Sequence, residues 1–229
     1  MSDLSEFKLI SPYAFLNDKF YDEVDPAKFP KFITRYRNPN FEEFKNLNNE
    51  QWVNIFGKFE SPILPKIKNI AMRYHGHQFQ VYNPDIGDGR GFTIAQFYKN
   101  KELYDLGTKG SGVTPYSRSG DGRLTLKGGV REVLCSNYLD ALGVNTSKSL
   151  SLIETGEHLS RNDEPSPTRS SVLVRVSHSH LRIGTFQYHA FHQDTQSIEF
   201  LTNMIGKYYF NLNDQNNQPI KVFSEVVQR

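Results

Sequence analysis

Two short glycine-rich motifs and one lysine are the residues of this chain best suited to bind a charged ligand. The tetrapeptide Gly-Asp-Gly-Arg occurs at Gly87–Arg90 and again at Gly120–Arg123, and Lys109 lies between the two copies. Glycines let backbone amides approach an anion, an arginine can donate two parallel hydrogen bonds to phosphate oxygens, and a lysine adds a point charge. This arrangement indicates a site for a polyphosphate, most simply a nucleotide.

A glutamate downstream of Lys109 adds to this interpretation. Residues 92–98 and 102–108 have the composition of strands, and residues 130–142 have the period of a helix, so Lys109 would end a strand and Glu132 would lie on a helix. In kinase-like folds a strand lysine holds nucleotide phosphates and pairs with a helix glutamate. The alternative is a surface lysine and a glutamate favoured by the helix dipole. Neither loop matches the kinase GxGxxG motif, and no GxxxxGK[ST] motif occurs.

The helix at 130–142 is expected to begin after Gly128 and Gly129 and to end at Gly143. Its apolar residues fall on two faces, which predicts a helix buried between layers, with Glu132 on a buried stripe and Cys135 as a small buried residue.

The remaining elements are expected as follows. Strands are predicted at 149–154 and 171–177, with a polar loop at 161–169 between them, and a helix is predicted at 198–210. Residues 1–60 are rich in aromatic residues but irregular, and are interpreted as an extension that wraps a domain and contains a short helix near 40–54.

Composition restricts the class of protein. The 229 residues fit one large domain or two small lobes, and 37% hydrophobic with 13% aromatic residues support a packed core. A net charge of +2 gives no general case for nucleic-acid binding. No apolar run approaches the roughly 20 residues of a spanning helix, and no signal peptide is recognisable, so we expect neither a membrane partner nor secretion. A single cysteine excludes an internal disulfide and fits a cytoplasmic location.

Two histidine pairs, His75 with His77 and His178 with His180, raise the question of a metal site. Residues at i and i+2 point the same way on a strand. No carboxylate or cysteine context completes a zinc ligand set, so we expect no metal site here and interpret these histidines as structural, or as orienting loops near the nucleotide.

A series of longer motifs in fixed order resembles one family. They are Tyr74-His75-Gly76-His77-Gln78-Phe79, the two Gly-Asp-Gly-Arg loops, Lys109-Gly110-Ser111-Gly112, Thr114-Pro115-Tyr116-Ser117-Arg118, Arg131-Glu132, Leu142-Gly143-Val144-Asn145-Thr146 and Arg175–Phe186. The chain resembles the SelO family, which includes the YdiU-type proteins. The resemblance is specific from about Tyr74 to Tyr188 and looser over the N-terminal part.

The resemblance implies an α+β, protein-kinase-like fold that transfers AMP from ATP to protein hydroxyl groups, with ATP bound in a flipped orientation. Carried over by position, the implied nucleotide-binding residues are Gly87, Gly89, Arg90, Lys109, Asp121, Gly122, Arg175 and Arg182. Lys109 would also pair with Glu132, and the two arginines would hold the terminal phosphates. The implied substrates are ATP with Mg²⁺ and proteins with hydroxyl side chains.

The resemblance also implies a second half that this sequence does not contain. Family members are roughly twice as long, and their catalytic aspartate and magnesium ligands lie in an Asn-Cys-Asp-Asn-like loop and a DYGP-like segment, neither of which occurs here. We therefore expect no catalytic or metal-binding residue in this chain, and we expect the catalytic aspartate to lie beyond Arg229, the last residue of the sequence.

The expected organisation is that of an N-terminal piece. It consists of an extension at 1–60, a nucleotide-binding lobe at 61–190 and the start of a helical C-lobe at 191–229, truncated before the catalytic loop. A separately encoded C-terminal half would be a partner; the alternative is an inactive remnant or a non-catalytic nucleotide-binding protein.

Overall fold

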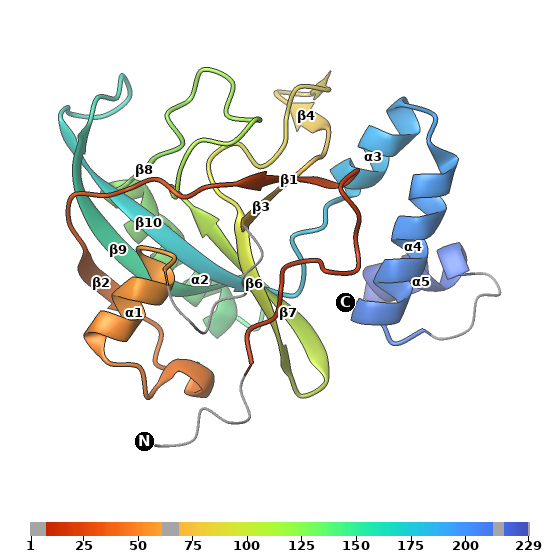
Figure 1. The fold of residues 1–229 in the computed structure, drawn as a ribbon, viewed down its shortest axis with the longest axis horizontal. Coiled ribbons are helices and arrows are strands. Elements are labelled where there is room, and N and C mark those ends of the chain that lie inside the picture. Colours follow the sequence, from red (N-terminus) through yellow and green to blue (C-terminus); the bar gives the residue numbers. More distant parts are fainter. Residues whose placement is uncertain (1–7, 61–68, 213–217, 229) are drawn as a thin grey trace.

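In the computed structural model, residues 8–60, 69–212 and 218–228 are described, and they form an α+β fold around one mainly antiparallel sheet (Figure 1). The sheet order is β1-β3-β6-β7-β10-β9-β2, with β8 beside β10, and β4 and β5 form a separate hairpin. The strands are β1 (Tyr21–Val24), β2 (Ile33–Arg37), β3 (Asn69–Met72), β4 (Gly76–Gln78), β5 (Val81–Asn83), β6 (Thr93–Lys99), β7 (Glu102–Lys109), β8 (Leu124–Thr125), β9 (Lys148–Leu159) and β10 (Thr168–Ser177). The helices are α1 (Asn49–Phe56), α2 (Leu126–Ala141), α3 (Ile183–Phe191), α4 (Thr195–Tyr209), α5 (Gln218–Gln228) and the short 3-10 helix η1 (Glu42–Phe44).

The centre of the sheet confirms the strands expected at 92–98 and 102–108. β6 and β7 form a hairpin whose turn residues, Asn100 and Lys101, both have positive φ, as a two-residue turn matched to strand twist requires. The strands expected at 149–154 and 171–177 are also present but longer, because β9 and β10 continue as a ladder to Leu159 and Thr168.

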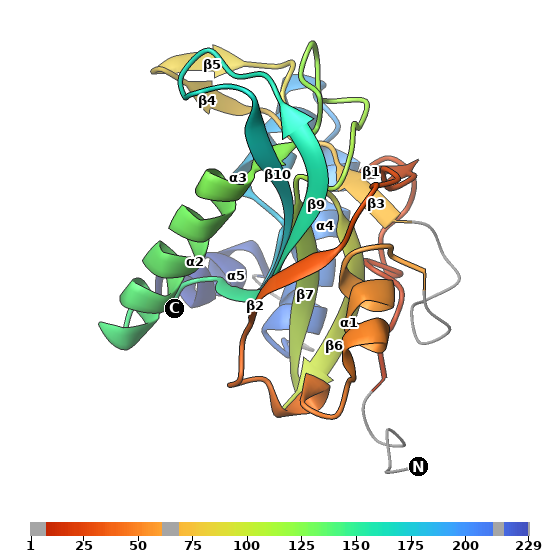
Figure 2. The same cartoon turned by 90° about the vertical axis from the view of Figure 1, so that its left-hand side faces the viewer.

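The N-terminal extension is less irregular than the sequence indicates. β1 pairs with β3 and β2 pairs with β9, so residues before 60 supply both ends of the sheet order (Figures 1 and 2). The short helix expected near 40–54 is present as α1, with η1 just before it. The expectation of an irregular segment is wrong at β1 and β2, because pairing with strands distant in sequence stabilises these half-polar segments.

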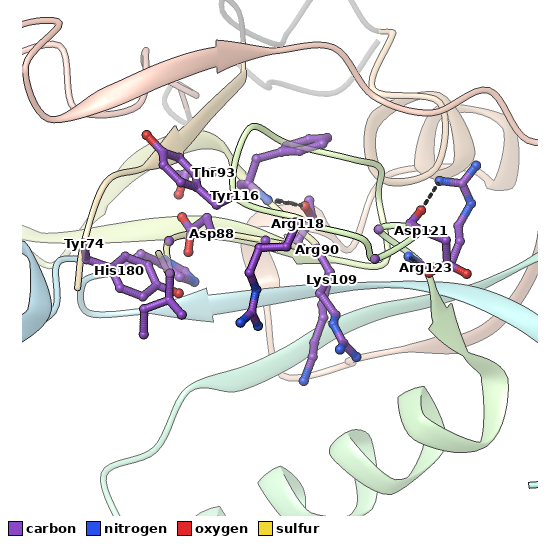
Figure 3. Close-up of a pocket in the computed structure, with 18 of the residues that line it drawn as sticks. Tyr74, Asp88, Arg90, Thr93, Lys109, Tyr116, Arg118, Asp121, Arg123 and His180 are labelled. Atoms are coloured by element: carbon purple, nitrogen blue, oxygen red, sulfur yellow. Dashed lines mark hydrogen bonds between the residues drawn. The ribbon is translucent and has the colours of Figure 1, made fainter. Parts of the chain in front are cut away.

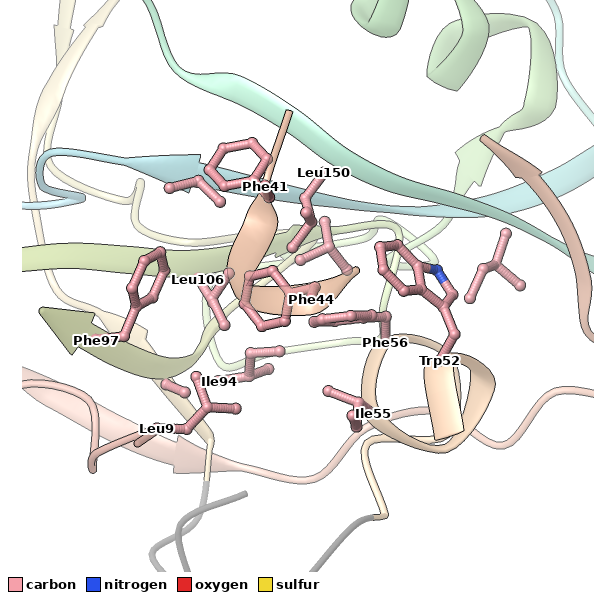
Figure 4. Packing of buried hydrophobic residues seen from close by; sticks show 14 of the residues in the cluster. Leu9, Phe41, Phe44, Trp52, Ile55, Phe56, Ile94, Phe97, Leu106 and Leu150 are labelled. Atoms are coloured by element: carbon pink, nitrogen blue, oxygen red, sulfur yellow. The ribbon is translucent and has the colours of Figure 1, made fainter. Parts of the chain in front are cut away.

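One hydrophobic core lies between α1 and the sheet. Trp52 and Phe56 from α1 pack with Phe44 of η1, with Phe97 of β6 and with other buried residues (Figure 4). The Trp52 indole Nε1 donates a hydrogen bond to the hydroxyl of Ser151 on β9, 2.8 Å away, so its buried polar group is satisfied. This contact fixes the extension to β9.

Helix α2 covers the other face of the sheet, opposite α1 (Figure 2). It begins earlier than expected, with Thr125 as N-cap, so Gly128 and Gly129 lie in the helix. Its end at Gly143 agrees with the sequence: the Val144 amide bonds to the Leu139 carbonyl in a Schellman arrangement.

The expectation that α2 is buried between layers is wrong for this chain. Val133 packs on the sheet, but Leu134 and Tyr138 are 63% and 67% exposed, and Cys135 is exposed. The apolar pattern marks two faces, and the described residues cover only one of them.

A second hydrophobic cluster joins the C-terminal helices to the sheet. Leu201 and Ile205 on α4 pack with Tyr13 and Phe20 from the extension and with Ile70 on β3. The helix expected at 198–210 is α4, while α3 and α5 had no prediction.

Two predictions of chain organisation fall partly on residues outside the described ranges. The domain boundaries near 60 and 190 stay predictions, and residue 61 lies outside those ranges. Arg229, beyond which the catalytic aspartate is expected, also lies outside the described residues, since α5 is described only to Gln228. The expected position of that aspartate therefore stays a prediction as well.

Candidate functional site

A cleft of about 910 Å³ lies where the two Gly-Asp-Gly-Arg loops meet the sheet (Figure 3). This volume is in the range of small-ligand sites. The first loop follows β5 and leads into β6, and the second follows β7 and leads into β8 and α2. All eight residues expected to bind nucleotide line this cleft: Gly87, Gly89, Arg90, Lys109, Asp121, Gly122, Arg175 and Arg182. The structure thus brings the predicted residues together, and their binding role stays a prediction.

Glycine is required at Gly122 in the second loop. Its φ is +66°, and a Cβ atom there would lie 2.1 Å from the Gly112 carbonyl oxygen. The Gly112 amide in turn donates to the Gly122 carbonyl, so residues 110–122 close into a compact loop. This loop presents Tyr116 and Asp121 to the cleft.

Lys109, at the end of β7, is paired with Glu132 on α2. Its Nζ atom donates to Glu132 Oε1, while Oε2 of the same carboxylate lies 3.7 Å from a guanidinium nitrogen of Arg175. Glu132 does not line the cleft itself; it holds two cations that do. Its side chain is 28% exposed, so it is not on a fully buried stripe as the sequence indicates.

The cleft is strongly basic. The seven basic side chains that line it are Arg90, Lys109, Arg118, Arg123, Arg161, Arg175 and Arg182, against the acidic pair Asp88 and Asp121. Arg123 is held by two parallel hydrogen bonds to Glu157, and Arg161 pairs with Asp121 at 2.8 Å. Within the described ranges, neither Arg90 nor Arg182 forms an ion pair; Arg182 lies over the ring of Tyr74, 5.1 Å from its centre. The cleft therefore carries positive charge available to an anion.

The acids of the cleft differ in their surroundings. Burial raises the pKa of Asp88, opposed by the nearby Arg182, and its carboxylate accepts a hydrogen bond from the Met72 amide at 3.1 Å. Burial alone would also raise the pKa of Asp121, but hydrogen bonds from Arg161 and from the Arg123 amide outweigh it and lower that pKa. Burial raises the pKa of Tyr74 to about 12, so its phenol stays protonated at neutral pH.

Several residues that line the cleft were not predicted from the sequence to bind nucleotide. Tyr74, Thr93, Tyr116, Arg161 and His180 all line it. Tyr74, Tyr116 and His180 lie inside motifs that carry the family resemblance, which is a signal that could have marked them. Thr93 and Arg161 carry no comparable signal, because each reaches the cleft through strand and loop geometry.

The histidine pairs do not assemble a metal site. His75 Nδ1 bonds to the Tyr82 hydroxyl at 2.7 Å, His178 Nε2 to Asn145 at 3.0 Å, and His180 Nδ1 approaches Asp105 at 3.3 Å. β10 ends at Ser177, so His178 and His180 do not share a strand face. Across residues 8–60, 69–212 and 218–228, no group of three or more His, Cys, Asp or Glu side chains could hold a metal ion. In the same ranges, no helix combines the length and apolar composition that crossing a membrane requires.

The fold and cleft define an α+β protein with a basic site suited to an anionic ligand, and comparison with known sequences identifies its family. Residues 4–229 match the family model described as protein adenylyltransferase SelO. This chain therefore belongs to the SelO family, whose relatives are named as nucleotidyltransferases.

Individual relatives agree with this assignment. The chain is 49% identical over 226 residues to the protein nucleotidyltransferase YdiU of Synechococcus elongatus, and the aligned region covers 95% of this chain and 45% of the relative. It is 52% identical over 208 residues to the protein of that name in Trichodesmium erythraeum, covering 88% and 43%. A more distant YdiU, from Vibrio cholerae, is 40% identical over 162 residues, covering 70% and 32%. The chain spans less than half the length of these relatives.

Proposed function

We propose that this chain provides the nucleotide-binding part of an enzyme that transfers AMP from ATP to hydroxyl side chains of proteins. The observation that carries the proposal is the Lys109–Glu132 pair at the edge of a basic cleft that Arg175 and Arg182 also line. A strand lysine paired with a helix glutamate is how protein kinases hold ATP phosphates. Family membership and this pair together support a kinase-like fold for the whole enzyme.

The positions of the cations suggest how ATP lies. Arg175 and Arg182 bind the terminal phosphates, Lys109 binds a phosphate nearer the centre, and the two glycine-rich loops contact the rest of the nucleotide. A hydroxyl oxygen of the protein substrate then forms a bond to the α-phosphorus, and the bond from that phosphorus to the bridging oxygen of pyrophosphate breaks. The arginines neutralise the charge that develops on the pyrophosphate.

The base and the metal of this reaction come from outside the described residues. Asp121 is engaged by Arg161 and Asp88 by the Met72 amide, so the acids of the cleft do not form a magnesium site by themselves. We therefore place the magnesium ligands, and the aspartate that accepts the hydroxyl proton, in a C-terminal half like that of the longer relatives. This half is either continuous with the chain beyond Arg229 or a separately encoded partner.

A second candidate is a protein that binds nucleotide without catalysis. It is favoured by the cleft, in which both acids are already engaged, Asp88 by the Met72 amide and Asp121 by Arg161. The two candidates share the same cleft and differ only in whether a C-terminal half restores transfer.

Incorporation of AMP distinguishes the candidates. The 229-residue chain is incubated with Mg²⁺ and ATP labelled at the α-phosphate, alone and with the C-terminal half of the Synechococcus elongatus relative, and label on protein is measured. We expect no incorporation by the chain alone and incorporation in the mixture. A mixture that forms a complex and binds ATP without incorporation would support the non-catalytic candidate.

A further inference from the structure

Three polar side chains, those of Thr93, Arg175 and His180, converge at one end of the cleft. Thr93 on β6 is opposite Gly107 on β7, and Gly107 is opposite Arg175 on β10. Residues directly opposite one another in an antiparallel sheet point to the same face, so Thr93 and Arg175 flank a position that has no side chain. The ring of His180 fills this position.

The packing of His180 on Gly107 is close. A Cβ atom at Gly107 would lie 2.2 Å from His180 Nε2, so any larger residue there would displace the ring. The carboxylate of Asp105, two residues earlier on the same strand face, accepts hydrogen bonds from the His180 backbone amide at 2.6 Å and from Nδ1 at 3.3 Å. Nδ1 therefore faces the carboxylate, and Nε2 is left for the cleft that His180 lines.

Asp105 is itself fixed. It is fully buried, and its carboxylate also accepts hydrogen bonds from Tyr13, from Gln96 at 2.7 Å and from Tyr209 at 3.1 Å. Tyr13 comes from the N-terminal extension, Gln96 from β6 and Tyr209 from α4. Three parts of the chain that are distant in sequence therefore fix Asp105, which in turn fixes His180. This makes Asp105 a positioning residue for the imidazole.

Two hydrogen-bond donors beside His180, on Thr93 and Arg175, have no acceptor among the described residues. The Thr93 side chain is 1% exposed and its Oγ1 atom has no hydrogen-bond partner, and the buried Nε of Arg175 also has none, within the described part of the chain. Burial lowers the pKa of Arg175, since Glu132 offsets its charge only partly. Buried polar groups in native proteins are nearly always paired, so two unpaired donors at one end of a cleft indicate ligand oxygens.

We propose that Thr93 and His180, together with Arg175, form a subsite for the terminal phosphate of a nucleoside triphosphate, and that this subsite selects ATP over ADP. The inference rests on the proposed function, because it assumes that a nucleotide occupies the cleft with its terminal phosphates toward Arg175 and Arg182. The Thr93 hydroxyl and Arg175 Nε donate to phosphate oxygens. His180 contacts the same phosphate through Nε2, with its ring held from behind by the carboxylate of Asp105. Burial of Asp88 at the same end raises its pKa, which eases protonation of this carboxyl group beside an anion.

The test is a comparison of ATP and ADP affinity, because only ATP reaches the subsite fully. Calorimetric titrations with Mg²⁺ present are made on the wild-type 229-residue chain and on Thr93→Val and His180→Gln. We expect each substitution to weaken ATP binding about tenfold, the loss of one hydrogen bond to a charged group, and ADP binding less than about twofold. Thr93→Ser, which keeps the hydroxyl group, is the matched control and should keep the wild-type ratio of the two affinities.

Thermal unfolding of each variant verifies that it is folded. Equal losses of ATP and ADP affinity, or no loss of either, in a folded Thr93→Val variant would overturn the subsite while leaving the proposed function intact. A wild-type chain that binds neither nucleotide would overturn the proposed function and the subsite with it.

Discussion

Lys109 and Glu132, 23 residues apart in sequence, are joined by a hydrogen bond from Nζ to Oε1 that links the end of β7 to α2. Because both side chains are partly exposed, the pair by itself contributes little stability. Its consequence is geometric: it holds an ammonium group at the edge of the cleft, beside Arg175.

Replacing Lys109 with alanine removes a phosphate ligand and leaves the fold intact. We expect Lys109→Ala to weaken ATP binding by about tenfold or more, since charge-assisted hydrogen bonds to phosphate are among the strongest in proteins. Isothermal titration calorimetry measures this loss. Lys127→Ala is the matched control, because Lys127 is an exposed lysine on α2 that does not line the cleft. Unchanged affinity in Lys109→Ala would remove the lysine from the list of ligands.

A leucine in the hydrophobic core and a leucine on the outer face of α2 should differ in how much their replacement by alanine lowers the free energy of unfolding. Leu150 is fully buried in the core between α1 and the sheet, whereas Leu134 on α2 is 63% exposed. We expect Leu150→Ala to lower the free energy of unfolding by about 2–5 kcal/mol, and Leu134→Ala to change it by less than about 0.5 kcal/mol. Urea unfolding followed by circular dichroism measures both. A large loss in Leu134→Ala would mean that this face of α2 is covered in solution.

An ion pair between the extension and the sheet should make stability depend on pH. Asp22 on β1 accepts two hydrogen bonds from Arg73, at 2.6 and 2.9 Å, which lower the pKa of its carboxyl group in the folded state. Stability from this pair is then fully present above the unfolded-state pKa of about 3.9 and is lost as the pH falls through the folded-state value.

We therefore expect Asp22→Asn to be less stable than wild type by about 1 kcal/mol at pH 7, a value reduced by solvent screening, with the difference shrinking below about pH 4. Free energies of unfolding at pH 7, 5 and 3 measure the effect. Asp163→Asn, at an exposed loop position, serves as control. A difference that stays constant from pH 7 to pH 3 would contradict the assignment.

The exposed apolar side chains of the C-terminal helices should bind an apolar dye. Phe223 on α5 is 69% exposed and Ile183 on α3 is 80% exposed, beside an apolar groove that Leu181 and Phe186 also line. Exposed apolar patches of this kind mark surfaces that other protein segments cover. We expect the native chain to enhance the fluorescence of anilinonaphthalene sulfonate, and Phe223→Ser to reduce the enhancement without altering thermal unfolding. A native chain that binds no dye would contradict the exposure of these apolar side chains in solution.

Local sequence predicted the elements whose residues determine them without distant partners. Strand β6 follows from its apolar and aromatic run and β7 from apolar residues such as Leu103 and Leu106 in a short segment, and the end of α2 follows from Gly143. β1 and β2 could not be predicted, because their half-polar segments become strands only by pairing with β3 and β9. The exposed face of α2 was missed for the opposite reason, since an apolar pattern indicates that a face is suited to burial but not whether the chain covers it.

Motifs in the sequence predicted which residues gather at the cleft, while their role in binding a nucleotide stays a prediction. The glycine-rich loops, Lys109 and the two arginines lie around one cleft as the family resemblance implies. Thr93 and His180 were not expected as ligands, because their positions follow from strand register and from the buried Asp105, which the order of residues along the chain does not show.

Calorimetric titration of the purified 229-residue chain with ATP and Mg²⁺ is the direct test of a nucleotide site in the basic cleft. We predict saturable binding of one ATP per chain, weakened in Arg182→Ala because Arg182 lines the cleft without an ion-pair partner among the described residues. A folded chain that gives no heat of binding and protects no amide of the two Gly-Asp-Gly-Arg loops from hydrogen exchange would contradict it.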